Sequence, residues 1–380
     1  MVLKFRNKYF AQVAALVLCL VLPSLAFAGA KIKIDDTKYF QIGAGFRATV
    51  ALNENSAPDV GEDALDINAD NMRIYTVSQV HKNIQVEYNT EHSGGTITLL
   101  DAVAKFNFAP IEIWAGRHLP PSDRANLDGP FYLNAAYTYP MVQSFGNLGI
   151  FAGRDNGVSI HGDVGGGKIK WAYGAFEGRT NNTNTDSNPD QKDNVKHTAR
   201  IDFALGDPEP GFYTGSTYFG AKNLTTIGLV WHREEDGVGT AADQGDFTGL
   251  SADILIERTL GSGAVVNLEG AYYDWDTDGK ADGTILQGDS FLALASYLMP
   301  GKTSIGGFQG QLQPYVRYQG YDQDNSNTAG SRGYKDRTEA GLNYVLDGFN
   351  AKLTAYWYVD ADHDNNVDKN VAALAMQFQL

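Results

Sequence analysis

Through most of its length the chain repeats one pattern, a run of alternating side chains followed by a turn or a polar loop. Residues 42–52 place apolar side chains at every even position and small or polar ones at the odd positions. Residues 371–380 alternate in the same way, with Met376 and Phe378 on one face and Gln377 on the other. Successive side chains of a β-strand point to opposite faces, so a period of two predicts strands. We therefore expect an all-β fold.

Sixteen such runs can be counted, and an even number of antiparallel strands is typical of bacterial outer-membrane barrels. The predicted strands are 38–52, 72–81, 84–91, 96–108, 111–117, 157–164, 168–178, 196–206, 224–233, 248–259, 264–275, 288–299, 308–321, 336–346, 350–360 and 370–380. One residue is awkward in this scheme, because Pro314 lacks the N–H that a sheet ladder needs and predicts a bulge or a misplaced strand. An exported soluble β-sandwich is the alternative.

The connections between the runs favour the barrel, which alternates short periplasmic turns with longer external loops. Short connections are 82–83, 109–110, 165–167, 260–263 and 347–349. Long polar connections are 53–69, 118–156, 179–195, 234–247, 276–287, 322–335 and 361–369. They fall on opposite sides, which predicts both termini on the periplasmic side. Two connections fit badly, since 92–95 is short for an external loop and 207–223 is long for a periplasmic turn.

Residues 1–28 carry the parts of a secretory signal peptide: basic residues, an apolar run from Ala11 to Leu22, and a small-x-small site at Ala26-Phe27-Ala28. We expect cleavage there, which leaves 29–380 as one barrel domain without the only cysteine, Cys19. After residue 28 no apolar run approaches the roughly 20 residues of a spanning helix. A membrane location then requires a barrel, which pairs every backbone group in lipid.

The formal net charge is −15, which argues against nucleic acid as a partner because phosphate binding depends on clustered Lys and Arg. Loops 53–69 and 234–247 carry five acidic residues each and no Lys or Arg. Such loops suit divalent cations that bridge the phosphates of membrane lipid and lipopolysaccharide. A cation-selective vestibule and plain loop solubility are the alternatives.

The motifs of catalysis and metal binding are missing or incomplete in this sequence. It contains no HExxH pair and no GxSxG element. Asp274 to Gly279 resembles the first half of a calcium loop, but Ile285 stands where the bidentate Glu belongs. We expect no enzyme activity, no cofactor and no metal site.

Alternation also assigns charged side chains to the face away from lipid, because Lys or Arg at the lipid midplane costs roughly 2–4 kcal/mol. The basic candidates for the lumen are Arg47, Lys105, Lys168, Lys170, Lys196, Arg200 and Arg317. The acidic ones are Asp101, Asp202, Asp253, Glu257, Glu269 and Glu339. Neither sign dominates, so these residues predict a water-filled lumen and leave its ion selectivity open.

Several short motifs resemble the phosphate-selective porin O and P family. They are Gly116-Arg-His-Leu-Pro-Pro-Ser122, Arg154-Asp-Asn-Gly-Val158, His161-Gly162, Trp171-Ala-Tyr-Gly-Ala-Phe-Glu-Gly178, Leu312-Gln-Pro-Tyr-Val-Arg-Tyr318 and Glu339-Ala-Gly-Leu-Asn-Tyr344. The resemblance implies a sixteen-stranded barrel, usually a homotrimer, whose third external loop folds inward as a constriction. Loop 118–156, the longest, is the third external loop of our scheme. Two departures are the final Leu380, where an aromatic residue is usual, and the absence of a tight Arg or Lys row.

The constriction candidates lie in and beside this loop, where opposed charges would act as a sieve for small polar solutes. They are Arg117, His118, Asp123, Arg124, Asp128 and Arg154. Arg117 and Arg154 occupy the positions where the family motif has arginines. Salt bridges within the loop and solvated side chains are the simpler interpretation.

Together these features predict an outer-membrane porin of a Gram-negative bacterium that passes ions and small polar solutes passively. A phosphate- or anion-selective channel is one alternative. The other is a scaffold barrel that sheathes a partner protein in its lumen.

Overall fold

The computed structural model describes residues 29–59, 61–93, 95–136, 142, 153–179, 190, 192–280, 287–324, 333–363 and 366–380. The predicted signal peptide, 1–28, lies outside these residues. The fold is a closed antiparallel barrel of sixteen strands with two extra short strands, so the predicted fold class is confirmed. The barrel strands are β2 (Tyr39–Asn53), β3 (Ala64–His81), β4 (Ile84–Ser93), β5 (Thr96–Asn107), β6 (Ile111–His118), β7 (Asp155–Val164), β8 (Ile169–Phe176), β9 (Lys196–Ala204), β10 (Leu224–Thr240), β11 (Asp243–Thr259), β12 (Val265–Asp276), β13 (Gly288–Leu298), β15 (Phe308–Gln323), β16 (Gly333–Asp347), β17 (Ala351–Asp362) and β18 (Val367–Gln379).

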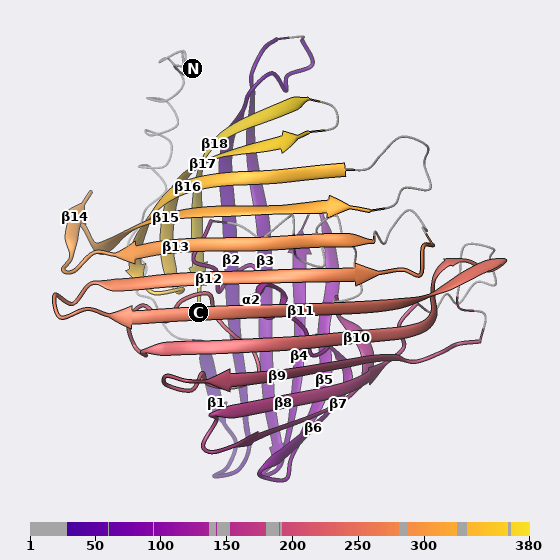
Figure 1. The fold of residues 1–380 in the computed structure, drawn as a ribbon. Helices are drawn as coiled ribbons and strands as arrows, with labels where there is room; N and C mark the ends of the chain where they lie inside the picture. Colours follow the sequence, from indigo (N-terminus) through magenta and orange to yellow (C-terminus); the bar gives the residue numbers. More distant parts are fainter. Residues whose placement is uncertain are drawn as a thin grey trace.

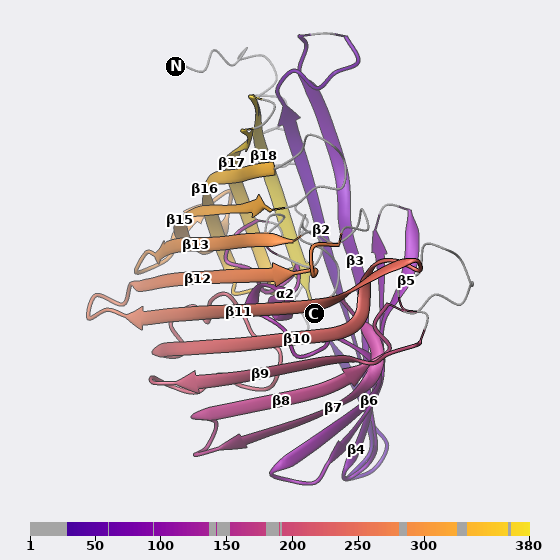
Figure 2. The ribbon, with the colours of Figure 1, turned by 45° about the vertical axis from the view of Figure 1, so that its right-hand side comes forward.

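The first and last barrel strands close the sheet. β18 pairs with β2 from Val371 opposite Asn53 to Gln379 opposite Gly45. The short strand β1 (Ala30–Lys33) continues along β2 beyond that point. In Figure 1, β2 to β5 run behind β8 to β13 at a steep angle, and Figure 2 shows the same two walls from the side. The barrel thus has two facing walls built from different parts of the chain.

The second extra strand, β14 (Thr303–Ile305), pairs with the start of β15, the strand that contains Pro314. The ladder between β13 and β15 ends at Tyr315, one residue after Pro314. On the other side Pro314 pairs with Leu342 of β16 without a register shift. The strand prediction there is confirmed and the predicted bulge is wrong, because β16 keeps its register at Pro314 and the Met299 N–H still donates to the Leu312 carbonyl beyond it at 2.8 Å.

Most charged side chains of the barrel strands point into the barrel, and the outward-facing rows are largely apolar. On β11, Asp253 and Glu257 are 3% and 0% exposed, whereas Leu250 is 49% exposed. Leu229 and Trp231 on β10 are likewise exposed, while His232, the residue after Trp231, is buried. This inverts the distribution of a soluble protein and is the pattern of a barrel whose outer face meets lipid. No helix in the described part of the chain is long and apolar enough to cross a membrane.

Two predicted external loops are shorter than their composition suggested. β10 and β11 continue to Thr240 and from Asp243, so the predicted loop 234–247 is mostly strand. The acidic side chains suggested a loop, although the segment has alternating burial in which Val238 and Phe247 are fully buried. The predicted loop 53–69 is likewise shorter, because β3 begins at Ala64.

We call the end of the barrel with the short connections the turn end, and the opposite end the loop end.

Candidate functional site

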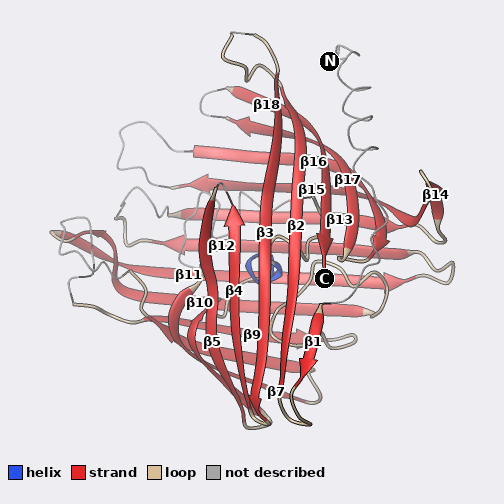
Figure 3. Cartoon of the chain, turned by 180° about the vertical axis from the view of Figure 1, so that it is seen from behind, coloured by secondary structure: helices blue, strands red, loops and turns tan. Residues whose placement is uncertain are grey.

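The connection between β6 and β7 enters the lumen and forms the helix α2 (Arg124–Asp128) there. Asp123 caps the helix by accepting from the Asn126 backbone N–H at 3.0 Å. The helix ends at Gly129, whose φ of 55° is easily adopted by glycine. All five helix residues are buried, and Figure 3 shows the helix between the walls of the barrel. The described part of this loop therefore runs inward, as predicted.

Wall side chains hold the chain that follows the helix. Gln377 Nε2 of β18 donates to the Phe131 carbonyl at 2.8 Å. Lys352 Nζ of β17 donates to the Leu133 carbonyl at 2.7 Å, and Asn343 Nδ2 of β16 donates to the Asn134 carbonyl. These donors satisfy backbone carbonyls that would otherwise be buried without partners. The sequence signal for them was their place on the inward face, but their loop partners could not be predicted.

The connection 205–223 between β9 and β10 also folds into the lumen, although it starts at the turn end. Glu257 of β11 holds it by three hydrogen bonds, which come from Thr217 Oγ1 at 2.6 Å, the Tyr218 N–H at 2.8 Å and the Gly220 N–H at 2.8 Å. This explains why the segment is too long for a turn. We name it the inner segment.

Arg124 of α2 joins the two intruding segments. Its two Nη groups donate to the Glu209 carboxylate of the inner segment at 2.7 and 2.6 Å. Its backbone N–H donates to Asp253 Oδ2 of β11 at 3.1 Å, and Arg200 of β9 also pairs with Asp253. Burial alone would raise the pKa of Glu209, but the attraction of Arg124 outweighs it and lowers the pKa below its ordinary value.

Other contacts extend this junction. Thr214 Oγ1 of the inner segment donates to Asp128 Oδ1 at 2.5 Å. The Asn134 N–H donates to Ser216 Oγ at 2.9 Å. Burial and the nearby Glu269 carboxylate raise the pKa of Asp128 well above its ordinary value. The helix and the inner segment thus form one packed body against β9 to β12.

Behind this body a hydrogen-bonded chain of two histidines and a serine lies on the wall. His118 Nδ1 is 3.0 Å from the Gly116 carbonyl, which can only accept. In the neutral imidazole, Nε2 must then accept from Ser159 Oγ at 2.7 Å, and Ser159 Oγ accepts from His161 Nε2 at 2.7 Å. Phe212 of the inner segment packs edge-on against His161, with ring centroids 4.6 Å apart.

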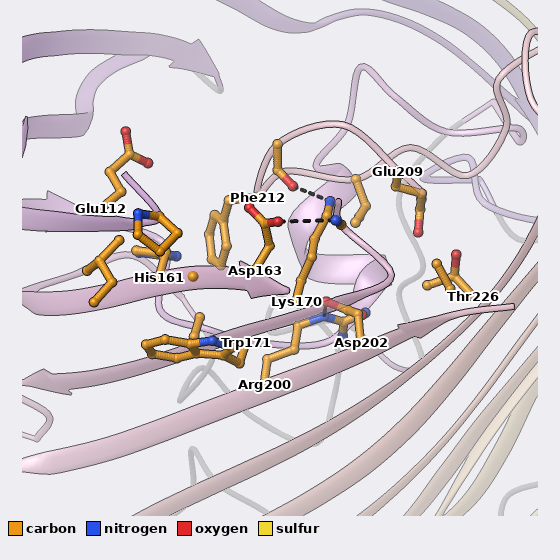
Figure 4. A pocket seen from close by; sticks show the side chains of 18 of the residues that line it. Glu112, His161, Asp163, Lys170, Trp171, Arg200, Asp202, Glu209, Phe212 and Thr226 are labelled. Carbon is orange, nitrogen blue, oxygen red and sulfur yellow. Dashed lines mark hydrogen bonds and ion pairs between the residues drawn. The ribbon is translucent and has the colours of Figure 1, made fainter. Parts of the chain in front are cut away.

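Among the cavities of the described lumen, two lie beside the packed body. The larger, about 670 Å³, lies between the packed body and the wall of β2 to β5, and we call it the passage. Its lining includes Arg73, Asp101, Arg154, Tyr132 and Tyr213. The smaller, about 290 Å³, lies at the turn end below the inner segment and is shown in Figure 4. In that view Lys170 points toward the inner segment, where its Nζ donates to the Gly211 carbonyl at 2.6 Å.

Four of the basic lumen candidates, Arg47, Lys105, Arg200 and Arg317, have buried side chains with polar partners. Lys105 pairs with Glu87 at 2.6 Å, and Arg200 pairs with Asp253 at 2.6 Å. Arg317 pairs with Glu339, and Arg47 Nη2 donates to the Ala136 carbonyl. These contacts agree with the expected inward direction.

The constriction candidates divide into separate groups. Asp123, Arg124 and Asp128 belong to the packed body, while His118 is buried in the wall behind it. Arg154 pairs with Asp101 at 2.7 Å beside the passage. The expected place of Arg117 is wrong, because it lies opposite Ala102 and Asn156 in the outward-facing row of β6. The motif predicted a basic residue there but could not predict which face it takes.

No protein-family model matches the chain. A curated relative, an uncharacterised protein of Aquifex aeolicus (strain VF5), is 25% identical over 244 residues, which are 59% of this chain and 53% of that protein. The chain thus spans about half the length of the curated relative it matches.

Solved structures share the fold at low sequence identity. OprB of Pseudomonas putida has a TM-score of 0.58 and 8% identity, with 90% of this chain and 94% of that chain covered. The outer membrane channel DcaP of Acinetobacter baumannii has a TM-score of 0.54 and 13% identity, with 93% and 100% covered. The trimer form of OmpT, an outer membrane protein of Vibrio cholerae, has a TM-score of 0.55 and 11% identity, with 91% and 100% covered. The chain therefore has the fold of an outer-membrane barrel.

Proposed function

We propose that the chain forms a passive diffusion channel for ions and small polar solutes in the outer membrane of a Gram-negative bacterium. The observation that carries this proposal is the passage, a cavity of about 670 Å³ with charged and aromatic lining inside a barrel whose outer face is apolar. A water-filled lumen bounded by polar side chains is what passive transfer requires. The similarity to barrels described as outer membrane proteins and channels supports the location.

The two alternatives have less support in the described lumen. Phosphate selectivity needs cationic side chains that are free to bind the anion. Both arginines that line the passage in the described ranges are instead paired with carboxylates. A sheath for a partner protein needs an open lumen, whereas helix α2 and the inner segment occupy much of this one. A general channel therefore explains the geometry best.

The test is single-channel recording of the purified protein in a planar bilayer under a salt gradient, with and without phosphate. We expect stepwise currents, a zero-current potential close to zero and no block by phosphate. Anion-selective steps that phosphate blocks would favour the phosphate channel. A protein with no steps would overturn the channel proposal.

A homotrimer belongs to the same proposal, supported by the fold shared with the trimer form of OmpT. Contact with lipopolysaccharide and cleavage after residue 28 are also part of it. Crosslinking in native membranes tests the oligomer, and N-terminal sequencing of the protein from those membranes tests the cleavage site. Monomers alone, or an uncleaved chain, would contradict these parts without touching the channel itself.

A further inference from the structure

Three pairs of opposite charges lie on the wall beside the passage, and each pair has at least one member in its lining, which includes Arg73, Glu87, Asp101 and Arg154. Arg73 of β3 pairs with Glu91 of β4, and Lys105 of β5 pairs with Glu87 of β4 at 2.6 Å. Arg154 pairs with Asp101 of β5 at 2.7 Å. Three cations thus meet three carboxylates. The formal charges of these three pairs cancel, although this part of the wall is densely polar.

An amide extends the row of polar groups. Asn89 Nδ2 donates to Asp101 Oδ2 at 2.9 Å, so Asp101 accepts from Asn89 and Arg154 at once. Only Nε of Arg154 is used in that pair, and no other bond of its guanidinium is found in the chain as described. The wall therefore presents donors and acceptors side by side.

Aromatic rings line the same cavity on the side of the packed body. Tyr132 follows helix α2 and is 42% exposed, and Tyr213 and Tyr218 come from the inner segment. Tyr75 of β3 contributes a ring from the wall. Tyrosine offers an apolar ring together with a hydroxyl group. One side of the passage is thus rich in rings, and the other in paired charges.

We infer that the passage favours neutral solutes rich in hydroxyl groups, such as sugars and polyols, an inference that rests on the channel function proposed above. A hydroxyl group both donates and accepts, so neighbouring hydroxyls can bond a guanidinium and the carboxylate beside it. A free anion or cation finds its own charge next to the opposite one and gains little. The C–H face of a sugar ring packs against an aromatic ring, and the cavity volume lies within the range of about 300–1,000 Å³ of small-molecule sites.

Swelling of liposomes that contain the purified full-length protein tests this inference with matched solutes. Ribose and triethylene glycol have nearly the same mass, but only ribose carries many hydroxyl groups. Glucose, gluconate and N-methylglucamine share a hydroxylated carbon skeleton and differ in charge. We expect ribose to enter severalfold faster than triethylene glycol, and glucose to enter at least as fast as either charged analogue.

Asp101→Asn is the decisive variant, because it removes one carboxylate from the matched wall and leaves Arg154 without its partner. We expect the ratio of the ribose entry rate to the triethylene glycol entry rate to fall. We also expect the entry rate of gluconate to rise relative to that of N-methylglucamine. The control is Asp246→Asn, which changes the net charge equally but lies in a half-exposed pair with Arg233 near the loop end. It should leave the order of the solutes unchanged.

Tyr132→Leu provides a second variant that keeps every charge. It should slow ribose more than triethylene glycol. Potassium chloride conductance in the same preparations reports whether each variant forms a channel. Normal conductance with equal entry of ribose and triethylene glycol would overturn this inference alone, whereas absence of conductance in the native protein would overturn the channel function.

Discussion

The two walls of the lumen use their buried charges differently. On the wall of β3 to β5, Arg73 and Lys105 pair with carboxylates of the neighbouring strand, and a cavity stays open beside Arg73. On the opposite wall, Asp253 and Glu257 of β11 bond to segments that enter the lumen. Charges paired within a wall leave a passage, whereas charges paired across the lumen fill it.

Shortening the inner segment should have the largest effect, because it empties the filled side. Hydrogen bonds from Leu205 to Thr225 and from Asp207 to Asn223 continue the hairpin for a short distance beyond the strands. Residues 208–222 can therefore be replaced by Gly-Asn, which forms a tight turn. We expect single-channel conductance to rise severalfold. Unchanged conductance would mean that the inner segment does not limit the current.

Arg124→Met should release the inner segment without deleting it. The change leaves Glu209 and Asp253 buried with one cation fewer, and breaking such a buried pair costs about 3–5 kcal/mol. We expect faster proteolysis within 205–223 and larger, noisier currents. The matched control is Arg233→Met, since its half-exposed pair with Asp246 contributes about 0–1 kcal/mol. Equal protease resistance of both variants would contradict the role of Arg124.

The packed body also has a carboxylate that weakens it at neutral pH. Burial and the neighbouring Asp253 raise the pKa of Asp123 to about 6 from its ordinary 3.8. The folded state then holds this proton more tightly than the unfolded state. The contribution of the protonated Asp123 to the free energy of unfolding is therefore complete below pH 3.8 and is lost as pH rises to about 6.

Asp123→Asn should therefore stabilise the protein at pH 7, by at most about 3 kcal/mol, and have little effect near pH 4. The asparagine oxygen can still accept from the Asn126 N–H and from Tyr273 Oη, so the helix cap is retained. Thermal unfolding in detergent at both pH values measures the difference. A gain of the same size at pH 4 would rule out the proton as its cause.

The smallest difference concerns two arginines at the two ends of the connection between β6 and β7. Arg154→Ala removes the partner of Asp101 beside the passage and should move the zero-current potential toward cation preference. Arg117→Ala changes a residue of the outward row, whose Nε donates to the Leu99 carbonyl, and should leave that potential as in the native channel. Equal shifts of the zero-current potential in both variants would show that Arg117 affects ion selectivity despite its outward position.

The sequence determined the strands and their faces. Each predicted run overlaps one barrel strand, from 38–52 on β2 to 370–380 on β18. Alternation is a local property of the chain, and one face had to meet lipid, so the inward direction of Arg200 and Arg317 could be read directly. Where polar composition was used instead, as at 234–247, the prediction failed.

Only the tertiary structure decided what these inward side chains meet. Arg124 and Glu209 are 85 residues apart, and Arg124 and Asp253 are 129 apart, yet they form one junction. Nothing in either local sequence specifies the other partner, and the excess length of 207–223 indicated an unusual turn without indicating its direction. Closing the barrel brings these segments into one small lumen, where burial makes unpaired charges costly and so selects the pairs.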